Sequence, residues 1–241
     1  MKVRWLIICL CLAGCRTPSR VVSPHQAAKP PTPTPAIQPI KHDTPAPALD
    51  GLDRAADRVQ KGDLEGAVAA FKEHLREHPD QFMIRAYLAE VLFQMKKLSD
   101  AQEQYDRFSI EAQDADGPAR KQLLHAHTRL MEIAQDRDDS YTEHLHRGIG
   151  LVLLVRQLES SGTSTEAEPG FQERLLCKAV TEFTYAKKIR PDEPRPHWYL
   201  AEVFNRMDQP RSAERALKQA KSLAALLPLP PAEQRALNVA R

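Results

Sequence analysis

Pairs of histidines are the residues of this 241-residue chain whose spacing could bind a metal ion. His74 and His78 are four positions apart, which places both side chains on one face of a helix. A protein zinc site needs at least three ligands, and the sequence places no further His, Cys or carboxylate to complete this one. Two other pairs are two positions apart and would point to different helix faces: His125 with His127, and His144 with His146. We therefore expect no metal site.

Motifs for other chemistry are also missing from the sequence. Gly148-Ile149-Gly150, after Arg147, resembles part of a glycine-rich phosphate-binding loop. However, no strand precedes it and no third glycine follows at the required spacing. The carboxylates are scattered among Lys and Arg at helical spacing, as on a solvated surface. The sequence contains no nucleophile elbow and no zinc signature, so it predicts neither an enzyme nor a bound cofactor.

Cys15 is the one residue whose context predicts a covalent modification. Lys2 and Arg4 precede an apolar run of eight residues from Trp5 to Leu12, which is too short to span a bilayer. The next residues resemble the lipobox of bacterial lipoproteins, ending in Leu12-Ala13-Gly14-Cys15. This resemblance covers only the first fifteen residues. It implies that residues 1–14 are a cleaved signal peptide and that diacylglycerol and palmitate on Cys15 anchor the chain to a membrane.

The residue after the lipidated cysteine bears on the choice of membrane. Lipoproteins that stay in the inner membrane of many bacteria carry Asp at that place, and this chain has Arg16. The resemblance therefore implies an outer-membrane lipoprotein that faces the periplasm. An ordinary secretory signal or a buried helix is the alternative, and neither explains a cysteine at this place followed by a proline-rich stretch.

The other cysteines predict no internal disulfide. Cys9 and Cys11 leave with the signal peptide, so Cys177 is the only thiol left once Cys15 is lipidated. Cys177 stands between Leu176 and Ala179 in an apolar helical stretch, and we expect it to be a small buried side chain.

Residues 15–49 are expected to form a disordered tether. From Arg16 to Leu49 the chain has nine prolines, no glycine and no aromatic residue, which leaves little apolar surface to offset the entropy of ordering. The proline-rich part favours the extended polyproline II conformation and would act as a spacer. Without Lys2 and Arg4 the formal net charge of +2 falls to zero, which argues against a nucleic-acid partner.

Beyond residue 50 the sequence repeats itself at a period of 34 residues. Ala67 and Phe71 are matched 34 positions later by Ala101 and Tyr105. A second pair of matches lies further along the chain: Ala179 and Phe183 with Ala213 and Leu217. The spacing of apolar residues within each segment predicts amphipathic helices.

These matches resemble the tetratricopeptide repeat, a 34-residue helix-turn-helix unit with small residues where helices cross. Further positions agree with the family pattern: Leu88, Ala89, Leu92, Leu200, Ala201, Phe204 and the turn Gly62-Asp63. The resemblance implies an all-α fold, a solenoid of helix-turn-helix repeats over residues 50–226. Its clear repeats lie at about 48–115 and 171–226, with a loop at 159–170 and a C-terminal capping helix within 227–241.

The middle of the repeat domain fits the pattern less well. Strict alternation needs three helices between the clear repeats, but the sequence shows two, at 118–135 and 140–158. Either Gly148-Ile149-Gly150 breaks the second helix, or the alternation is interrupted. The apolar residues of 148–155 surround the whole helix, which predicts an element buried on all sides.

A repeat of this kind binds a partner on its concave face. The phasing places eight candidate groove residues there: Met83, Glu90, Phe93, Gln94, Trp198, Glu202, Asn205 and Arg206. Ala86 and Arg195 share these faces. Family members that bind a terminal carboxylate use Lys and Asn at positions where this chain has residues such as Ala86 and Glu90, so an amphipathic or extended peptide is the expected partner.

We therefore expect a non-enzymatic protein-protein interaction adaptor in envelope assembly or secretion, with a protein or peptide partner. No small-molecule substrate is evident. The alternatives are a self-associating structural lipoprotein and a helical accessory subunit of an envelope enzyme. A concentration-dependent mass would support the first of these, and a solvent-open acid, base or metal cluster would support the second.

Overall fold

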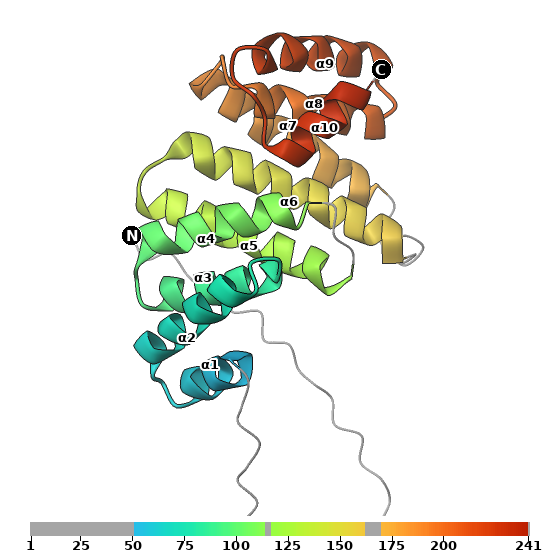
Figure 1. Ribbon diagram of the computed structural model, residues 1–241. Helices are drawn as coiled ribbons and strands as arrows, with labels where there is room; N and C mark the ends of the chain where they lie inside the picture. Colours follow the sequence, from blue (N-terminus) through green and yellow to red (C-terminus); the bar gives the residue numbers. More distant parts are fainter. Residues whose placement is uncertain (1–50, 114–116, 162–169, 241) are drawn as a thin grey trace, which may run out of the picture. The chain divides into compact units, whose positions relative to one another are not determined.

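The computed structural model describes residues 51–113, 117–161 and 170–240, all within one compact unit, Pro47–Arg241. The predicted signal peptide, Cys15, the proline-rich tether and most of the 159–170 loop lie outside the described residues. The described part of the chain is all-α, as predicted (Figure 1).

Ten helices follow one another in the described residues, and neighbouring helices run antiparallel (Figure 1). Their bounds are α1 (Gly51–Gln60), α2 (Leu64–Glu77), α3 (Phe82–Gln94), α4 (Leu98–Glu111), α5 (Pro118–Asp136), α6 (Ser140–Ser161), α7 (Phe171–Ile189), α8 (Pro194–Arg206), α9 (Pro210–Ala224) and α10 (Pro231–Val239).

A left-handed residue recurs in the turns between paired helices. Gly62 has φ 76°, and Lys96, 34 positions later, has φ 60°. Asp208 takes the same conformation with φ 54° between α8 and α9. Glycine adopts this conformation without strain, and after it the Asp63 side chain caps α2 by accepting from the Gly66 amide at 2.9 Å. The 34-residue separation of Gly62 and Lys96 shows that the sequence period is also a structural period in this part of the chain.

The repeated residues form the core. Each of the four matched alanines is buried, which allows two helices to approach closely at that position: Ala67, Ala101, Ala179 and Ala213. Their larger companions are buried as well: Phe71, Tyr105, Phe183 and Leu217. The residues matched at the 34-residue period are therefore core residues in both segments.

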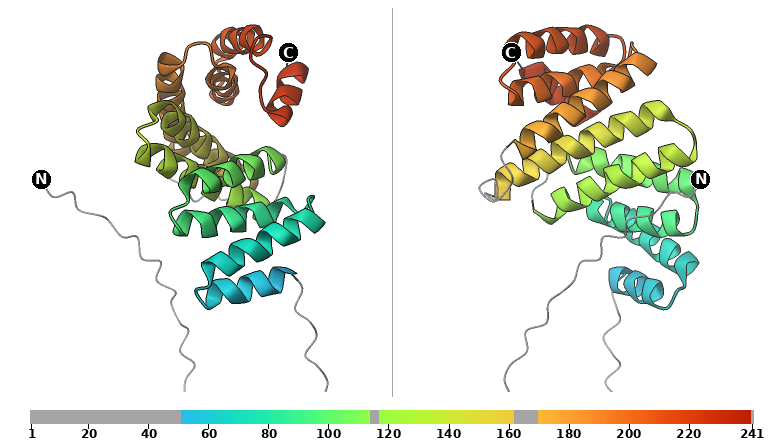
Figure 2. Two further views of the ribbon diagram at one scale, coloured as in Figure 1. Left: turned by 60° about the vertical axis from the view of Figure 1, so that its left-hand side comes forward. Right: turned by 180° about the vertical axis from the view of Figure 1, so that it is seen from behind.

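The middle of the domain contains an uninterrupted long helix. α6 continues through Gly148-Ile149-Gly150 and packs against both α5 and α7, between which it lies in the right view of Figure 2. A Cβ atom on Gly148 would lie 2.6 Å from the Phe183 ring, so glycine is what lets α7 pack so closely here. The glycines therefore do not break the helix, and the alternation of helices is interrupted instead.

The interrupted alternation of helices at α6 divides the repeats into two regions. In a helix-turn-helix solenoid, the first helices of successive units stack on one another. α3 contacts α5, and α6 contacts α8. The layer of first helices therefore passes from odd-numbered to even-numbered helices between α5 and α6. We call α1–α5 the N-terminal region and α6–α10 the C-terminal region.

The apolar segment of α6 is buried on most of its surface, although Gly150, Leu151 and Leu154 are only partly buried. No residue from Gly148 to Val155 is exposed, because α5 and α7 cover opposite sides of the helix. Among the described residues, no helix combines the length and the apolar character that crossing a bilayer requires.

One prediction for α7 is wrong: Cys177 is exposed. Leu176 and Ala179 belong to the buried stripe of α7, but Cys177 lies about 100° around the helix from Leu176 and faces solvent. The apolar neighbours in sequence pointed to burial, whereas the helical periodicity places this thiol outside.

Candidate protein-binding site

The predicted groove residues of the N-terminal region gather around Glu90 of α3. Its Oε2 atom accepts hydrogen bonds from the Tyr105 hydroxyl at 2.7 Å and from His125 Nε2 at 2.9 Å. Arg129 of α5 donates to both carboxylate oxygens, with Nε 3.1 Å from Oε2 and Nη2 3.0 Å from Oε1. Glu90 therefore connects α3, α4 and α5.

The donors around Glu90 keep it ionised. Partial burial would by itself raise the pKa of this carboxyl, but the hydrogen bonds from His125, Tyr105 and Arg129 lower the pKa to about 2. The same contact and the burial of its ring raise the pKa of Tyr105 above its usual range. Glu90 is thus an anion whose charge is already neutralised within the fold.

The other predicted residues of this region lie beside or near that cluster. Gln94 is exposed and donates to Glu90 Oε1 at 3.4 Å. The Phe93 ring is partly buried and lies 4.4 Å from the Arg129 guanidinium carbon, which covers it. Met83, near the start of α3, is partly buried against the core. This face presents little that is free to bind.

The predicted groove residues of the C-terminal region line a cavity. Trp198, Glu202, Asn205 and Arg206 border a space of about 440 Å³ between α8, α9 and the end of α10. Trp198 is partly buried and Asn205 is exposed, so one apolar wall and one polar rim meet at the opening. The structure therefore brings these four sequence-predicted residues to one place.

Only one of the two carboxylate oxygens of Glu202, which borders this cavity, accepts hydrogen bonds. Its Oε1 atom accepts from Arg156 Nε at 3.0 Å and from Arg206 Nε at 3.2 Å. Its Oε2 atom is buried and has no hydrogen-bond partner among the described residues. A buried carboxylate oxygen without a donor costs free energy, and a bound group with an N–H or O–H could satisfy it.

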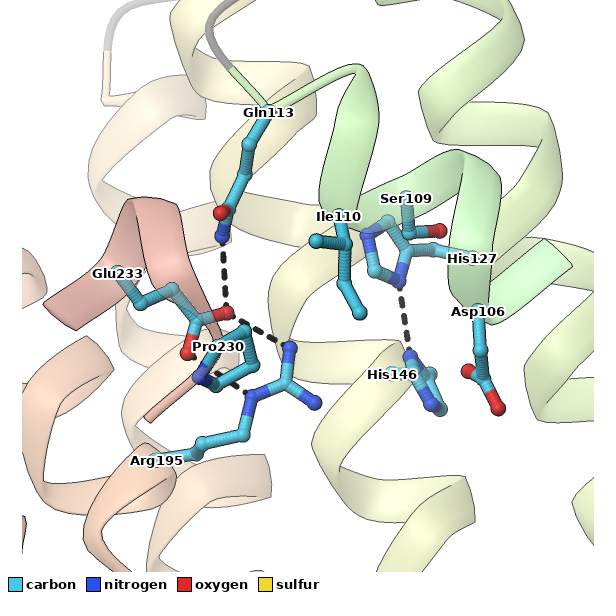
Figure 3. Close-up of a pocket in the computed structure, with 9 residues that line it drawn as sticks. All are labelled: Asp106, Ser109, Ile110, Gln113, His127, His146, Arg195, Pro230 and Glu233. Atoms are coloured by element: carbon cyan, nitrogen blue, oxygen red, sulfur yellow. Dashed lines mark hydrogen bonds and ion pairs between the residues drawn. The ribbon is translucent and has the colours of Figure 1, made fainter. Parts of the chain in front are cut away.

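A second cavity lies under α10, and α10 supplies its most buried charge (Figure 3). The Glu233 side chain accepts from Arg195 Nη2 at 2.7 Å, from Gln113 Nε2 at 2.9 Å and from the Tyr199 hydroxyl at 2.9 Å. Glu233 is 2% exposed. Burial by itself would lower the pKa of Arg195, but the nearby Glu233 carboxylate raises this pKa above its usual value. Arg195 was expected on the open groove face. It instead donates its hydrogen bonds to Glu233 of the chain's own C-terminal helix.

Two histidines meet on the other side of this cavity. His127 Nδ1 and His146 Nδ1 are 2.8 Å apart, and both rings are buried. Burial, and then the positive charge of Arg195, lowers the pKa of His127 to about 3. Burial also lowers the pKa of His146. Both rings are uncharged at neutral pH, so one Nδ1–H donates to the other nitrogen and the pair is a structural contact between α5 and α6.

His125 and His144 have partners on different helices, and the rings of His74 and His78 lie 4.8 Å apart, centroid to centroid. His125 contacts Glu90, whereas His144 Nδ1 lies 2.7 Å from Glu182 of α7. His74 Nε2 lies 2.9 Å from Gln81 Oε1. Within the described ranges no group of three His, Cys, Asp or Glu side chains could hold a metal ion. The geometry of these residues is that of helix-to-helix contacts.

Glu233 is the site residue that sequence reasoning missed. It lies four positions before buried Leu237 and next to buried Ala232 within α10, so the helical spacing places this acid on the buried face. That spacing is a signal in the sequence that Glu233 is buried. The sequence gives no signal for the partners of Glu233, because Gln113 is 120 positions away in the chain.

The family comparison identifies part of the N-terminal region. Residues 58–125 match the tetratricopeptide repeat family. This segment of the chain therefore carries tetratricopeptide repeats. This segment contains the period of Ala67 and Ala101 and the turn at Gly62, and the buried residues described above occupy the same pattern.

Several solved structures resemble the chain at low identity. A MamA structure is 16% identical, with 72% of this chain and 96% of that chain covered and a TM-score of 0.35. YrrB, described as a TPR protein with an unusual peptide-binding site, is 14% identical, with coverages of 73% and 85% and a TM-score of 0.34. MamA from Desulfovibrio magneticus RS-1 is 14% identical, with coverages of 73% and 93% and a TM-score of 0.32. No curated protein matches the chain significantly.

Proposed function

We propose that this chain is a lipid-anchored protein of the cell envelope that works as a non-enzymatic adaptor, and that its partner binds in the α8 cavity. The observation that carries the second part is the buried, unpaired Glu202 Oε2 beside Trp198. Tetratricopeptide repeats in residues 58–125 support a role in protein binding.

The lining of the α8 cavity defines the chemistry of the partner. Trp198 offers a broad apolar surface, and aromatic residues of this kind commonly dominate binding energy. Glu202 Oε2 needs a donor, which a backbone N–H or a Lys or Arg side chain can supply. Asn205 at the exposed rim can hydrogen-bond a peptide backbone. An extended or amphipathic peptide segment with an apolar residue and a nearby donor fits these groups.

The groove role of the N-terminal region stays a prediction with a smaller expected contribution. Glu90 already has donors on both oxygens, and Arg129 covers Phe93. A partner at this face would have to replace contacts that the fold already makes. We therefore assign the main binding energy to the C-terminal region.

The membrane anchor is proposed from Leu12-Ala13-Gly14-Cys15. Replacing Cys15 by Ser should leave the precursor unprocessed or release the protein from the membrane fraction. Intact-mass analysis of the wild-type chain should show acyl chains on a chain that begins at Cys15. A mature chain without acyl mass would contradict the lipoprotein assignment, and recovery in the inner membrane would contradict the outer-membrane assignment.

Crosslinking in the native cell tests the adaptor role. A photo-crosslinking amino acid at exposed Asn205 should capture a partner protein, and the same group at exposed Glu214 of α9 serves as a matched control. Capture at Asn205 should decrease when Trp198 is replaced by Ala. An adduct with a second copy of the chain would support the self-associating alternative. Equal capture at both positions would contradict binding at the α8 cavity.

A further inference from the structure

The surface under α10 binds the carboxylate of the chain's own Glu233. We call Arg195, Tyr199, Gln113 and the cavity beside them the α10 seat. Four hydrogen bonds reach Glu233: Arg195 donates to both oxygens, and Gln113 and Tyr199 each donate to Oε1 at 2.9 Å. A guanidinium that binds both oxygens of one carboxylate is specific for an acid rather than for any polar group.

The α10 seat is larger than its present occupant. A cavity of about 280 Å³ remains beside Glu233, between α4, α5, α6 and the start of α10 (Figure 3). Two buried polar atoms at this cavity have no hydrogen-bond partner among the described residues, Ser109 Oγ and Gln113 Oε1. Ser109 is only 8% exposed. A well-matched occupant would fill the space and pair these atoms, and α10 does neither.

α10 is also a small element on an extended connection. It has nine residues and is joined to α9 by a segment that contains Pro228 and Pro230. Leu229 and Leu237 are buried, but Leu226 of the connection is 85% exposed and Val239 is 76% exposed. An isolated helix of this length is unstable in water, so α10 depends on its contacts with the rest of the fold.

We infer that the α10 seat is a second docking site, which binds a helical segment of a partner protein carrying an acidic residue in the place of Glu233. α10 occupies the seat until that partner displaces it. The partner gains over α10 by filling the 280 Å³ cavity and by donating to Gln113 Oε1. The inference rests on the proposed adaptor function, because displacement requires a protein partner.

A peptide with the chain's own α10 sequence is the probe, because it carries the acid in its known context. A fluorescent peptide of residues 226–241 and the same peptide with Glu233→Gln are titrated against two full-length chains, wild type and Leu237→Ala. Leu237 is 1% exposed and lies outside the carboxylate contacts, so its replacement weakens α10 and leaves Arg195, Tyr199 and Gln113 intact.

The expected result depends on intramolecular competition. In the wild-type chain the tethered α10 has an effective concentration in the millimolar range and should keep the peptide out. Leu237→Ala should bind the Glu peptide at least about tenfold more tightly than wild type does. The Gln peptide should bind Leu237→Ala at least about tenfold more weakly than the Glu peptide, because it lacks the charge that Arg195 requires. Amide hydrogen exchange of wild type should be faster in α10 than in α8.

Other outcomes would overturn the inference. Equal binding of both peptides, or no binding to a Leu237→Ala chain that circular dichroism shows to be folded, would exclude a carboxylate seat. A Leu237→Ala chain that does not fold, or α10 amides that exchange only with those of α8, would make α10 part of the cooperative core. A mass that doubles with concentration would make a second copy the occupant. Peptide titration is independent of capture at Asn205, so either proposal can fail without the other.

Discussion

Glu90 and Glu202 occupy equivalent places in the two regions, each directly after the small residue of its first helix, Ala89 or Ala201. Glu90 accepts donors on both oxygens, from Tyr105, His125 and Arg129. Glu202 accepts on Oε1 alone, its Oε2 is buried without a partner among the described residues, and the residue borders a cavity of about 440 Å³. In the N-terminal region this repeat position has donors on both carboxylate oxygens, and we call it closed. In the C-terminal region one oxygen has no donor, and we call the position open.

The neighbouring helix accounts for this difference. In the N-terminal region α5 follows α4 directly and places His125 and Arg129 over Glu90. In the C-terminal region the next element after α9 is the short α10, whose end at Ala240 borders the cavity without giving Glu202 a donor. The repeat surface of α8 is thus bordered by the short α10, whereas the full-length helix α5 covers that of α3.

Replacing each glutamate by glutamine should have the largest effect on this comparison. Glu90→Gln places an NH₂ group against donors on whichever oxygen it replaces, and we expect it to lower the free energy of unfolding by about 3 kcal/mol. Glu202→Gln can place its NH₂ group at the unpaired Oε2 position, away from the arginine donors on Oε1, and should cost about 1 kcal/mol. Urea denaturation of both variants measures the difference. Equal losses would contradict the closed and open assignment.

The pH dependence of stability provides a second measurement on Glu90. Its pKa is about 2 in the folded chain, below the ordinary value of 4.5. The folded state therefore binds this proton less readily, and the contribution of Glu90 is full above about pH 4.5 and is lost as the pH falls toward 2. Glu90→Gln should remove this part of the acid dependence. A variant with the wild-type profile would show that other groups cause it.

Two glycines of α6 test the packing that separates the regions. Gly148→Ala would place a Cβ atom 2.6 Å from Phe183, and we expect it to destabilise the chain by about 2 kcal/mol through overpacking. Gly150→Ala is the matched control, since its Cβ atom would meet only Leu124 at 3.7 Å. It should stabilise the helix by about 0.5–1 kcal/mol. Thermal unfolding compares the two, and a stabilising Gly148→Ala would contradict the close α6–α7 crossing.

The contribution of Asp106 to the pH dependence of stability should have the opposite sign from that of Glu90 and a smaller magnitude. Burial raises the pKa of Asp106 to about 6, although Arg195 and a hydrogen bond with Gln102 oppose the shift. Its ionised form therefore destabilises the fold above about pH 6, and stability rises as the pH falls from there toward the ordinary value of 3.8. Asp106→Asn should stabilise the chain by about 1 kcal/mol at pH 8, measured by urea denaturation. At pH 3.5 the variant and wild type should be alike. A loss of stability at pH 8 would indicate that the Asp106 charge is used by the fold.

Much of the helical architecture could be predicted from the sequence, because it depends on local spacing. The 34-residue period predicted the burial of Ala67 and Ala101, and the apolar residues around α6 predicted an element covered on all sides. The same spacing also held information that was not used. The helical spacing of α7 places Cys177 in solvent, and the four-residue spacing from Glu233 to Leu237 in α10 places Glu233 inside.

The contacts between distant residues could not be predicted in this way. The sequence left open whether the glycines break the middle helix, because glycine is compatible with either outcome, and the contact of Gly148 with Phe183 decides it. The capture of Arg195 by Glu233 depends on how α10 turns back onto α8, which no local pattern encodes. Functional residues of the C-terminal region are defined by such distant contacts.

The central claim is that a partner binds the open face of α8 rather than the closed face of α3, and matched aromatic substitutions test it most directly. Once a partner has been captured at Asn205, its affinity is measured for Trp198→Ala and Phe93→Ala, together with the melting temperature of each chain. We expect Trp198→Ala to weaken binding at least about tenfold with a nearly unchanged melting temperature, and Phe93→Ala to change affinity much less. Weaker binding with Phe93→Ala and unchanged binding with Trp198→Ala would place the partner on α3 instead.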